Sequence, residues 1–172
     1  MKINTNKTHL QIIISFIILF TLVLYYYVRG NMTNHLIINE INFSQNGDAD
    51  WIEIYNPTLN NLSMENMYLS DKSNNITKFK INQNAVVPSK GYLVIYSDKY
   101  SDESNTDIIT ANFNISANET IYLVATDGKS IIDSLTAVAS DQEQTSIIGR
   151  YPDGCNNHLS LSIATPGTAN QL

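Results

Sequence analysis

The sequence contains little cysteine, histidine and charge. Its single cysteine, Cys155, excludes an internal disulfide framework. Charged residues make up only 15% of the chain, compared with about 25% in a typical soluble protein. With 172 residues the chain is too short for a multidomain enzyme with separate cofactor and substrate domains. Its polarity comes from 22 Asn, 16 Ser and 14 Thr, a composition that suits strands and turns better than helices.

Catalytic sequence patterns are missing as well. The chain has no Gly-rich phosphate-binding loop and no G-x-S-x-G nucleophile elbow. Cys155 and His158 are three residues apart, but two ligands do not complete a tetrahedral zinc site. Nothing nearby in the sequence would orient His158 as the base of a Cys–His nucleophile. We therefore predict that the protein is not an enzyme and that it has no catalytic residue and no cofactor.

Nineteen consecutive residues without a charge extend from Leu10 to Val28. A helix of this length spans about 28 Å, which matches the hydrocarbon core of a bilayer. The alternative, a cleaved signal peptide, has a shorter apolar run and a small-residue cleavage site, whereas Tyr25, Tyr26 and Tyr27 fit an interfacial belt. Lys2 and Lys7 predict that the N-terminus lies inside. The predicted single-pass membrane protein has a cytoplasmic N-terminus at residues 1–9, a transmembrane anchor at 10–28, a linker at 29–35 and a domain outside the cytoplasm at 36–172.

The part of the chain after residue 30 is acidic. It carries seven basic and sixteen acidic residues, a net charge of −9. A strong negative field repels phosphate backbones, so nucleic acid is an unlikely partner. The only basic group, formed by Lys72, Lys78 and Lys80, is better explained as protection of a strand edge.

Apolar and polar residues alternate with period two throughout this acidic part, and turn residues interrupt the alternation. This pattern is typical of an all-β sandwich or small barrel. Strands are predicted at residues 36–43, 51–55, 67–70, 76–81, 91–97, 120–125, 130–137 and 146–151. Asp127-Gly128 predicts a two-residue primed turn between two of them. The predicted core residues are Ile38, Ile41, Ile52, Ile54, Leu69, Phe79, Leu93, Ile95, Ile121, Leu123, Ile132 and Leu135, with Trp51 as the only large aromatic anchor.

Several short motifs follow one another in a characteristic order. They are Asn39-Glu40, DWIEIYNP at 50–57, YLSD at 68–71, VPSKGYLVI at 87–95, ETIYL at 119–123, GRYPDG at 149–154 and TPGTAN at 165–170. Over residues 36–170 the chain resembles the lamin tail domain as it occurs in bacterial and archaeal surface proteins. The resemblance implies an immunoglobulin-like β-sandwich without a catalytic site, here preceded by one N-terminal transmembrane helix. It also implies a tethering or binding role, since such domains are often joined to secreted nucleases or other hydrolases.

The motif residues are interpreted as structural. Glu53 lies between Trp51 and Tyr55 and needs hydrogen-bond donors if it is buried, which backbone N–H groups or Arg150 could supply. A ligand or metal contact at Glu53 is the alternative. Residues 165–170 are expected to turn back onto the sandwich and close it. The full set of motif positions is Asn39, Glu40, Trp51, Glu53, Asn56, Pro57, Gly91, Gly149, Arg150, Pro152, Asp153, Gly154, Pro166, Gly167 and Asn170.

Calcium is a better metal candidate than zinc. Asp48 and Asp50 share a loop with Asn46, and a second acidic group lies at residues 98–107. Neither group has the D-x-[DN]-x-[DN]-G spacing of a calcium loop, so solvated acidic loops are the preferred interpretation.

Two functions remain open at this point. The first is a membrane-tethered, extracytoplasmic, non-catalytic binding module that presents its sandwich to a protein or cell-envelope partner. The alternative is a small metal-dependent surface hydrolase, or an accessory subunit of a secreted nuclease or hydrolase. Fold alone does not decide between them.

Overall fold

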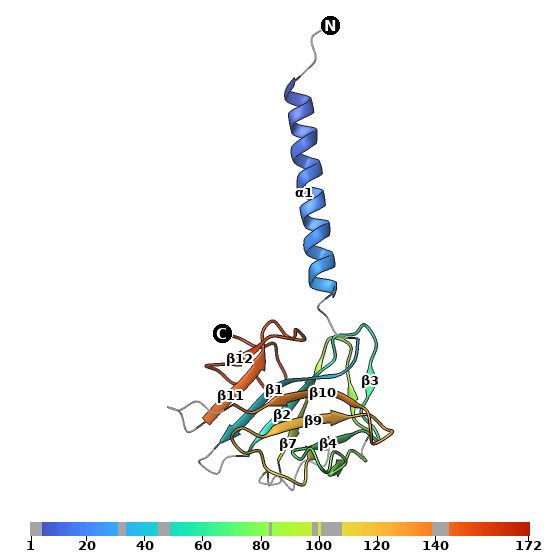
Figure 1. The fold of residues 1–172 in the computed structure, drawn as a ribbon, viewed down its shortest axis with the longest axis vertical. Coiled ribbons are helices and arrows are strands. Elements are labelled where there is room, and N and C mark those ends of the chain that lie inside the picture. Colours follow the sequence, from blue (N-terminus) through green and yellow to red (C-terminus); the bar gives the residue numbers. More distant parts are fainter. Residues whose placement is uncertain are drawn as a thin grey trace. The chain divides into compact units, whose positions relative to one another are not determined.

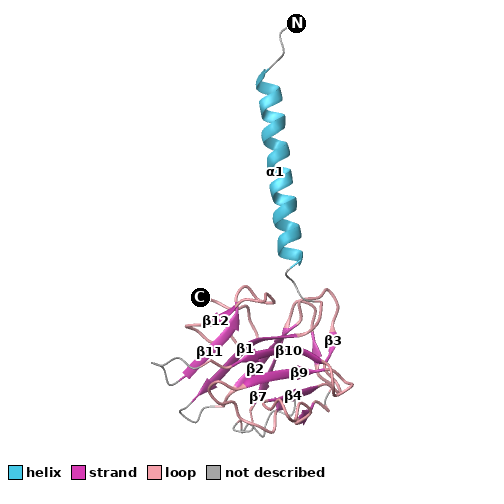
Figure 2. Ribbon diagram, in the orientation of Figure 1, coloured by secondary structure: helices cyan, strands magenta, loops and turns pink. Residues whose placement is uncertain are grey.

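The computed structural model describes residues 5–30, 34–44, 49–82, 84–97, 100, 108–138 and 145–172. The chain divides into two compact units, residues 1–32 and residues 33–172. The first contains helix α1 (Thr5–Gly30), and the second is built from the short strands β1 to β12 (Figures 1 and 2).

Helix α1 coincides with the segment that was predicted to be a membrane anchor. Its described side chains extend from residue 9 to residue 23, and all of them are exposed. Among the residues that the structure describes, no helix is long and apolar enough to cross a membrane. This finding contradicts the predicted single-pass localisation, with residues 1–9 in the cytoplasm and the C-terminal domain outside it.

The second unit is a sandwich of two main sheets. The larger sheet has the order β12-β11-β1-β2-β7-β8, the second has the order β10-β9-β4-β5, and β3 and β6 form a small separate pair. Neighbouring strands are antiparallel, except that β7 and β8 run parallel. The strand bounds are β1 Ile37–Ser44, β2 Trp51–Tyr55, β3 Leu62–Ser63, β4 Tyr68–Ser70, β5 Phe79–Lys80, β6 Val86–Val87, β7 Tyr92–Tyr96, β8 Ile109–Thr110, β9 Thr120–Val124, β10 Ile131–Thr136, β11 Thr145–Arg150 and β12 His158–Ser160.

The hydrophobic core lies between the two main sheets. It contains nine of the predicted core residues, and Phe79, Leu93 and Ile132 pack against it in partly buried positions. Trp51 does not belong to this core, although it is only 5% exposed. Because side chains alternate along β2, Trp51 lies on the opposite face from Ile52 and Ile54. Strand β2 is therefore buried on both faces.

The turn between β9 and β10 differs from the predicted two-residue primed turn. The N–H of Gly128 donates to the carbonyl of Ala125 at 3.0 Å, so Thr126 and Asp127 are the central residues of the turn. Gly128 follows them with φ +65°, whereas a type I′ turn would need positive φ at both central residues. Asp127 closes the loop by accepting hydrogen bonds from the N–H groups of Lys129 and Ser130, both at 2.9 Å.

Candidate functional site

Two buried glutamates define the outer face of the six-stranded sheet, the face turned away from the core. Glu40 on β1 lies directly opposite Glu53 on β2, and on its other side Glu40 lies opposite Gly149 on β11. Both glutamates are 0% exposed. The segment after β12, residues 161–170, covers them, and we call it the strap. Leu161, Thr165 and Asn170 of the strap are themselves buried.

Three carboxyl groups hold the backbone of the strap. The N–H of Thr165 donates to Glu40 Oε1 at 3.2 Å, and the N–H of Gly167 donates to Glu53 Oε2 at 2.7 Å. A third N–H, that of Asn170, donates to Asp153 Oδ1 at 3.1 Å. The acids on this face are thus used to bind main-chain donors of the same chain.

Asn39 connects two of these carboxyl groups. The strand register shifts between Ile38 and Glu40. This β-bulge changes the direction of the Asn39 side chain. Its Nδ2 donates to Glu53 Oε1 and to Asp153 Oδ1, both at 3.0 Å. The other oxygen of Asp153 accepts a hydrogen bond from the hydroxyl of Tyr92 at 2.6 Å.

Gly149 and Asn170 allow the strap to approach the sheet closely. A Cβ on Gly149 would overlap Leu161 Cδ1 and lie 2.6 Å from Asn170 Nδ2. The Asn170 amide fills this space and donates to the Arg150 carbonyl at 2.9 Å. A side chain at position 149 would therefore displace the Leu161 and Asn170 side chains of the closed strap. Gly167 has φ +77° and open space around its Cα, so backbone conformation is the reason for glycine there.

Arg150 was predicted as a possible hydrogen-bond donor to Glu53, but it binds other groups. Because it follows Gly149 in β11, its side chain leaves the opposite side of the strand and reaches β10. Its Nη2 binds both oxygens of Asp133 at 2.9 and 3.0 Å, and its Nε donates to the Ile38 carbonyl at 2.9 Å. The same Asp133 accepts the N–H of Ile38 at 2.8 Å, so this pair joins the two sheets.

Burial raises the pKa of both glutamates. The pKa of Glu53 rises to about 8, mainly through desolvation, although hydrogen bonds from Asn39 and Gly167 oppose the rise and the charges of Glu40 and Asp153 add to it. Desolvation also raises the pKa of Glu40, against the effect of its bonds to Thr165. Within the described part of the chain, no Lys or Arg forms a salt bridge with either glutamate.

The motif residues at the end of β2 form a separate turn cluster. Asn56 donates through Nδ2 to the carbonyls of Asn60 and Val87, at 2.7 and 3.0 Å. The N–H of Asn56 binds the Gly91 carbonyl at 3.0 Å, and the Pro57 carbonyl accepts a hydrogen bond from Lys90. These contacts end β2 and fix the turn that leads into β7.

The remaining motif residues support the turn after β11. Pro152 follows a cis peptide bond, and Gly154 has φ +77°. A Cβ on Gly154 would lie 3.1 Å from the Tyr55 ring, which stacks on Tyr92 with 4.9 Å between ring centroids. Pro166 lies in the strap beside Gly167. Tyr92 was not among the predicted site residues, although its alternation with Leu93 placed it on the same face as Glu53.

Within the described part of the chain, the calcium candidates do not form a metal site. Asp50 is buried, and its Oδ2 accepts the N–H of Ile115 at 3.0 Å. Asp48, Asn46 and the acidic residues of segment 98–107 lie outside the described residues. Within the described ranges, no group of three or more His, Cys, Asp or Glu side chains could hold a metal ion.

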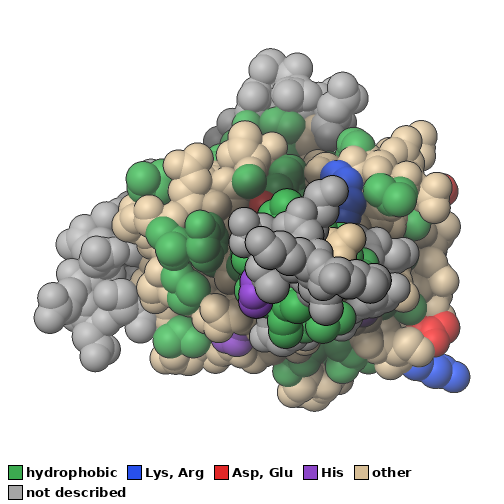
Figure 3. All heavy atoms as spheres, turned by 90° about the horizontal axis from the view of Figure 1, so that it is seen from above, with side chains coloured by type: hydrophobic (Ala, Val, Ile, Leu, Met, Phe, Trp, Pro, Cys, Tyr) green, Lys and Arg blue, Asp and Glu red, His purple; other side chains and the backbone are tan. Residues whose placement is uncertain are grey.

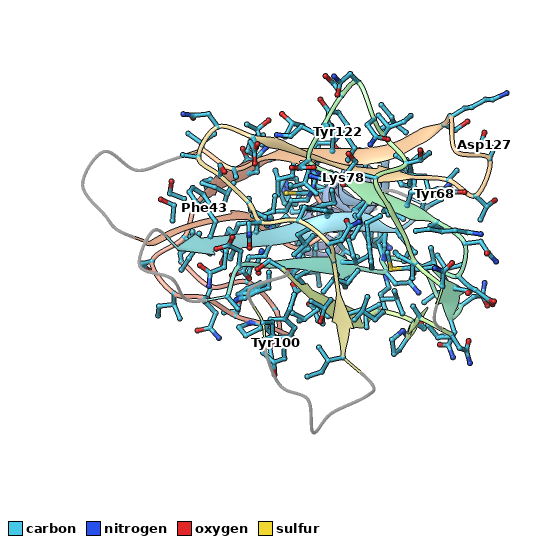
Figure 4. All side chains as sticks on the ribbon, turned by 90° about the horizontal axis from the view of Figure 1, so that it is seen from below. Phe43, Tyr68, Lys78, Tyr100, Tyr122 and Asp127 are labelled. Atoms are coloured by element: carbon cyan, nitrogen blue, oxygen red, sulfur yellow. The ribbon has the colours of Figure 1, made fainter. Side chains whose placement is uncertain are left out.

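The outer face of the four-stranded sheet is partly exposed. Leu69, Ile121, Leu123 and Leu135 point into the core, so the alternate residues of β4, β9 and β10 face outward. Ser70 and Val124 on this side are 0% exposed. The remaining outward residues, which we call the tyrosine face, are Tyr68, Thr120, Tyr122, Ser134 and Thr136. Figure 4 labels Tyr68 on β4 and Tyr122 on β9. Both tyrosines are partly exposed, and the period-two spacing around them was the signal that could have identified this face.

Charged side chains next to strands β4, β5 and β9 in the sequence form ion pairs. Lys72 pairs with Glu119 at 2.6 Å, and Lys78 pairs with Asp71 at 2.8 Å. In the view of Figure 3, few charged side chains are visible among the described residues. The residues of the tyrosine face are themselves uncharged.

Two packed, mainly antiparallel sheets make this domain a β-sandwich of the immunoglobulin-like class. The family model of the lamin tail domain matches residues 30–139, more than half of the chain. The chain therefore belongs to the lamin tail domain family, which confirms the resemblance seen in the sequence. No curated protein and no solved structure matches the chain. The match ends before β11, so Gly149, Asp153 and the strap lie outside the matched region.

Proposed function

We propose that this protein is a non-catalytic binding module that contacts a protein partner through its tyrosine face. The observation that carries this proposal is the contrast between the two outer faces. The strap covers one, while Tyr68 and Tyr122 remain partly exposed on the other. Tyrosine provides a large contact area with few rotatable bonds and a polar hydroxyl, and it is enriched in interfaces.

The use of the acidic residues supports a role in binding over one in catalysis. Glu40, Glu53 and Asp153 accept main-chain N–H groups of the strap, and Asp133 pairs with Arg150. Asp50, which the hydrolase alternative would use as a metal ligand, accepts the N–H of Ile115. No feature of the described residues favours the metal-dependent hydrolase. An accessory subunit that binds a hydrolase is one form of the binding role proposed here.

The test is capture of binding partners by the immobilised full chain, compared with a Tyr68→Ala/Tyr122→Ala variant. We expect the double substitution to reduce capture at least tenfold without changing the circular dichroism spectrum. The matched control is Leu59→Ala, which removes a side chain that is 81% exposed in the loop after β2 and should leave capture unchanged.

Equal capture by the double variant and the parent would refute the tyrosine face as the contact surface. A hydrolase screen on the same protein, with and without chelator, tests the non-catalytic part of the proposal. Turnover that the chelator abolishes would contradict it.

A further inference from the structure

The strap is held on the sheet by acids that also face one another. Glu40 and Glu53 are cross-strand neighbours, both are 0% exposed, and Asp153 joins the same hydrogen-bond network through Asn39. Like charges directly opposite each other on adjacent strands are destabilising, and burial increases the effect. This arrangement is stable only if the pair carries less than its full negative charge.

The hydrogen bonds allow a proton on Glu40. Thr165 Oγ1 lies 2.6 Å from Glu40 Oε2 and 2.9 Å from Asn170 Oδ1, yet a hydroxyl has only one proton to donate. The Asn170 Nδ2 donates to the Arg150 carbonyl, so its Oδ1 faces the hydroxyl of Thr165 as an acceptor. When Thr165 donates to Asn170, a protonated Glu40 donates to Thr165 Oγ1, and both contacts are satisfied.

We propose that the strap is a proton-operated latch. A protonated Glu40–Glu53 pair holds residues 161–170 closed, and loss of the proton releases the strap and exposes the outer face of the six-stranded sheet. The two carboxyls act as a coupled unit, since ionising either one places a charge beside the other. This inference is independent of the partner surface proposed above.

Among the described residues, no Lys or Arg pairs with Glu40 or Glu53 to stabilise the ionised pair. Asp153 is acidic, and the nearby Tyr92 and Tyr55 are neutral phenols whose pKa values are raised by burial and by Asp153. Arg150 directs its guanidinium to Asp133 and to the Ile38 and Cys155 carbonyls, on the opposite side of β11. Each negative charge gained by the pair is therefore added to an acidic environment.

The sign of the pH dependence follows from the raised pKa values. A carboxyl whose folded pKa lies above its ordinary value stabilises the closed form below that ordinary value, and this contribution is lost as the pH rises through the folded pKa. The ordinary value is 4.5 and the pKa of Glu53 is about 8. The strap should accordingly be closed at pH 6 and open above pH 9.

Amide hydrogen exchange on the full chain tests the latch. Protection factors of Thr165, Gly167 and Asn170, which correct for the intrinsic pH dependence of exchange, should fall at least tenfold between pH 6 and pH 9.5. Amides of β2 should keep their protection over the same range. Strap protection that is constant to pH 9.5, or that falls together with that of β2, would overturn the proposal.

Two variants separate the latch from a purely structural contact. The amide of Glu40→Gln copies the protonated acid, because its nitrogen can donate to Thr165 Oγ1 and its oxygen can accept the Thr165 N–H. This variant should keep the strap protected and weaken its pH dependence, whereas an open strap at pH 6 would show that the ionised form is needed and would overturn the proposal. Gly149→Ala provides the open reference, with the strap unprotected at pH 6. The wild-type profile decides the question even where a variant does not fold.

Discussion

The two outer faces of the sandwich arise from the same strand alternation but have opposite properties. The face of the six-stranded sheet contains Glu40 and Glu53, which are fully buried beneath the strap. On the face of the four-stranded sheet, Tyr68, Tyr122 and the hydroxyl residues Thr120, Ser134 and Thr136 are partly or fully exposed. The comparison teaches that residues with the chemistry of a catalytic site serve the fold here, while residues suited to contact lie on the open side.

The same difference applies to aromatic residues. Trp51 and Tyr55 on the covered face are 5% and 7% exposed. Tyr68 and Tyr122 on the tyrosine face are partly exposed. If burial is what distinguishes the two faces, removal of an aromatic side chain should have very different energetic costs on them.

The largest expected effect is therefore the loss of Trp51. Trp51→Ala should lower the free energy of unfolding by about 3 to 5 kcal/mol, because it leaves a large cavity on a strand that is buried on both faces. The matched change on the open face, Tyr122→Ala, should cost about 1 kcal/mol or less. Urea denaturation of both variants measures the difference. Similar losses would show that the two faces are equally buried.

The faces of β2 illustrate what the sequence could predict. The bounds of this strand match the prediction at Trp51 and Tyr55, since alternation runs through WIEIY and Asn56-Pro57 stops the strand. Alternation predicted Trp51 on the face opposite Ile52 and Ile54, in a strand covered on both sides, and the structure confirms this. When both faces of a strand are buried, hydrophobicity does not show which face packs against the core, so Trp51 was wrongly expected to anchor the core between the sheets.

Local sequence patterns could not predict the shortest strands or the contacts between distant residues, for two different reasons. The two-residue strands β3, β6 and β8 are too short to show period-two alternation. The bond from Gly167 to Glu53 joins residues 114 positions apart, and the sequence indicated only that residues 165–170 would fold back. Which donors satisfy Glu53 depends on how the strap lies on the sheet, and that is a tertiary property.

A smaller effect is expected from the acid on the covered face. Glu53→Gln should destabilise the protein by roughly 1 to 3 kcal/mol at pH 6. In the proposed closed form the proton of the pair lies on Glu40, so each oxygen of Glu53 accepts an N–H group, from Asn39 and from Gly167. The amide nitrogen of Gln must then face one of these donors. Thermal melts would measure the loss, with Glu65→Gln as the control because Glu65 is exposed. A Glu53→Gln protein that melts like the parent would rule out a structural role for these bonds.

The smallest expected effect comes from one substitution made on both faces. Thr120 and Thr136 form a cross-strand hydroxyl pair on the tyrosine face, with 2.9 Å between their Oγ1 atoms. Thr136→Val keeps the β-branched shape and removes the hydrogen bond, and because water reaches this face the cost should be about 0.2 to 1 kcal/mol. Thr165→Val removes a buried hydroxyl that links Glu40 to Asn170, so its cost should be greater, about 1 to 3 kcal/mol.

Chemical denaturation of the two Thr→Val variants at pH 6 compares the faces with side-chain size and shape held constant. A larger loss for Thr165 than for Thr136 is expected because the strap excludes water from the polar groups of Glu40 and Asn170 that lose their partner, whereas Thr120 on the open face can bind solvent instead. Equal losses would mean that the strap does not seal its face. The carboxyl groups beneath it would then be hydrated, and the proposed difference in water access between the two outer faces would be wrong.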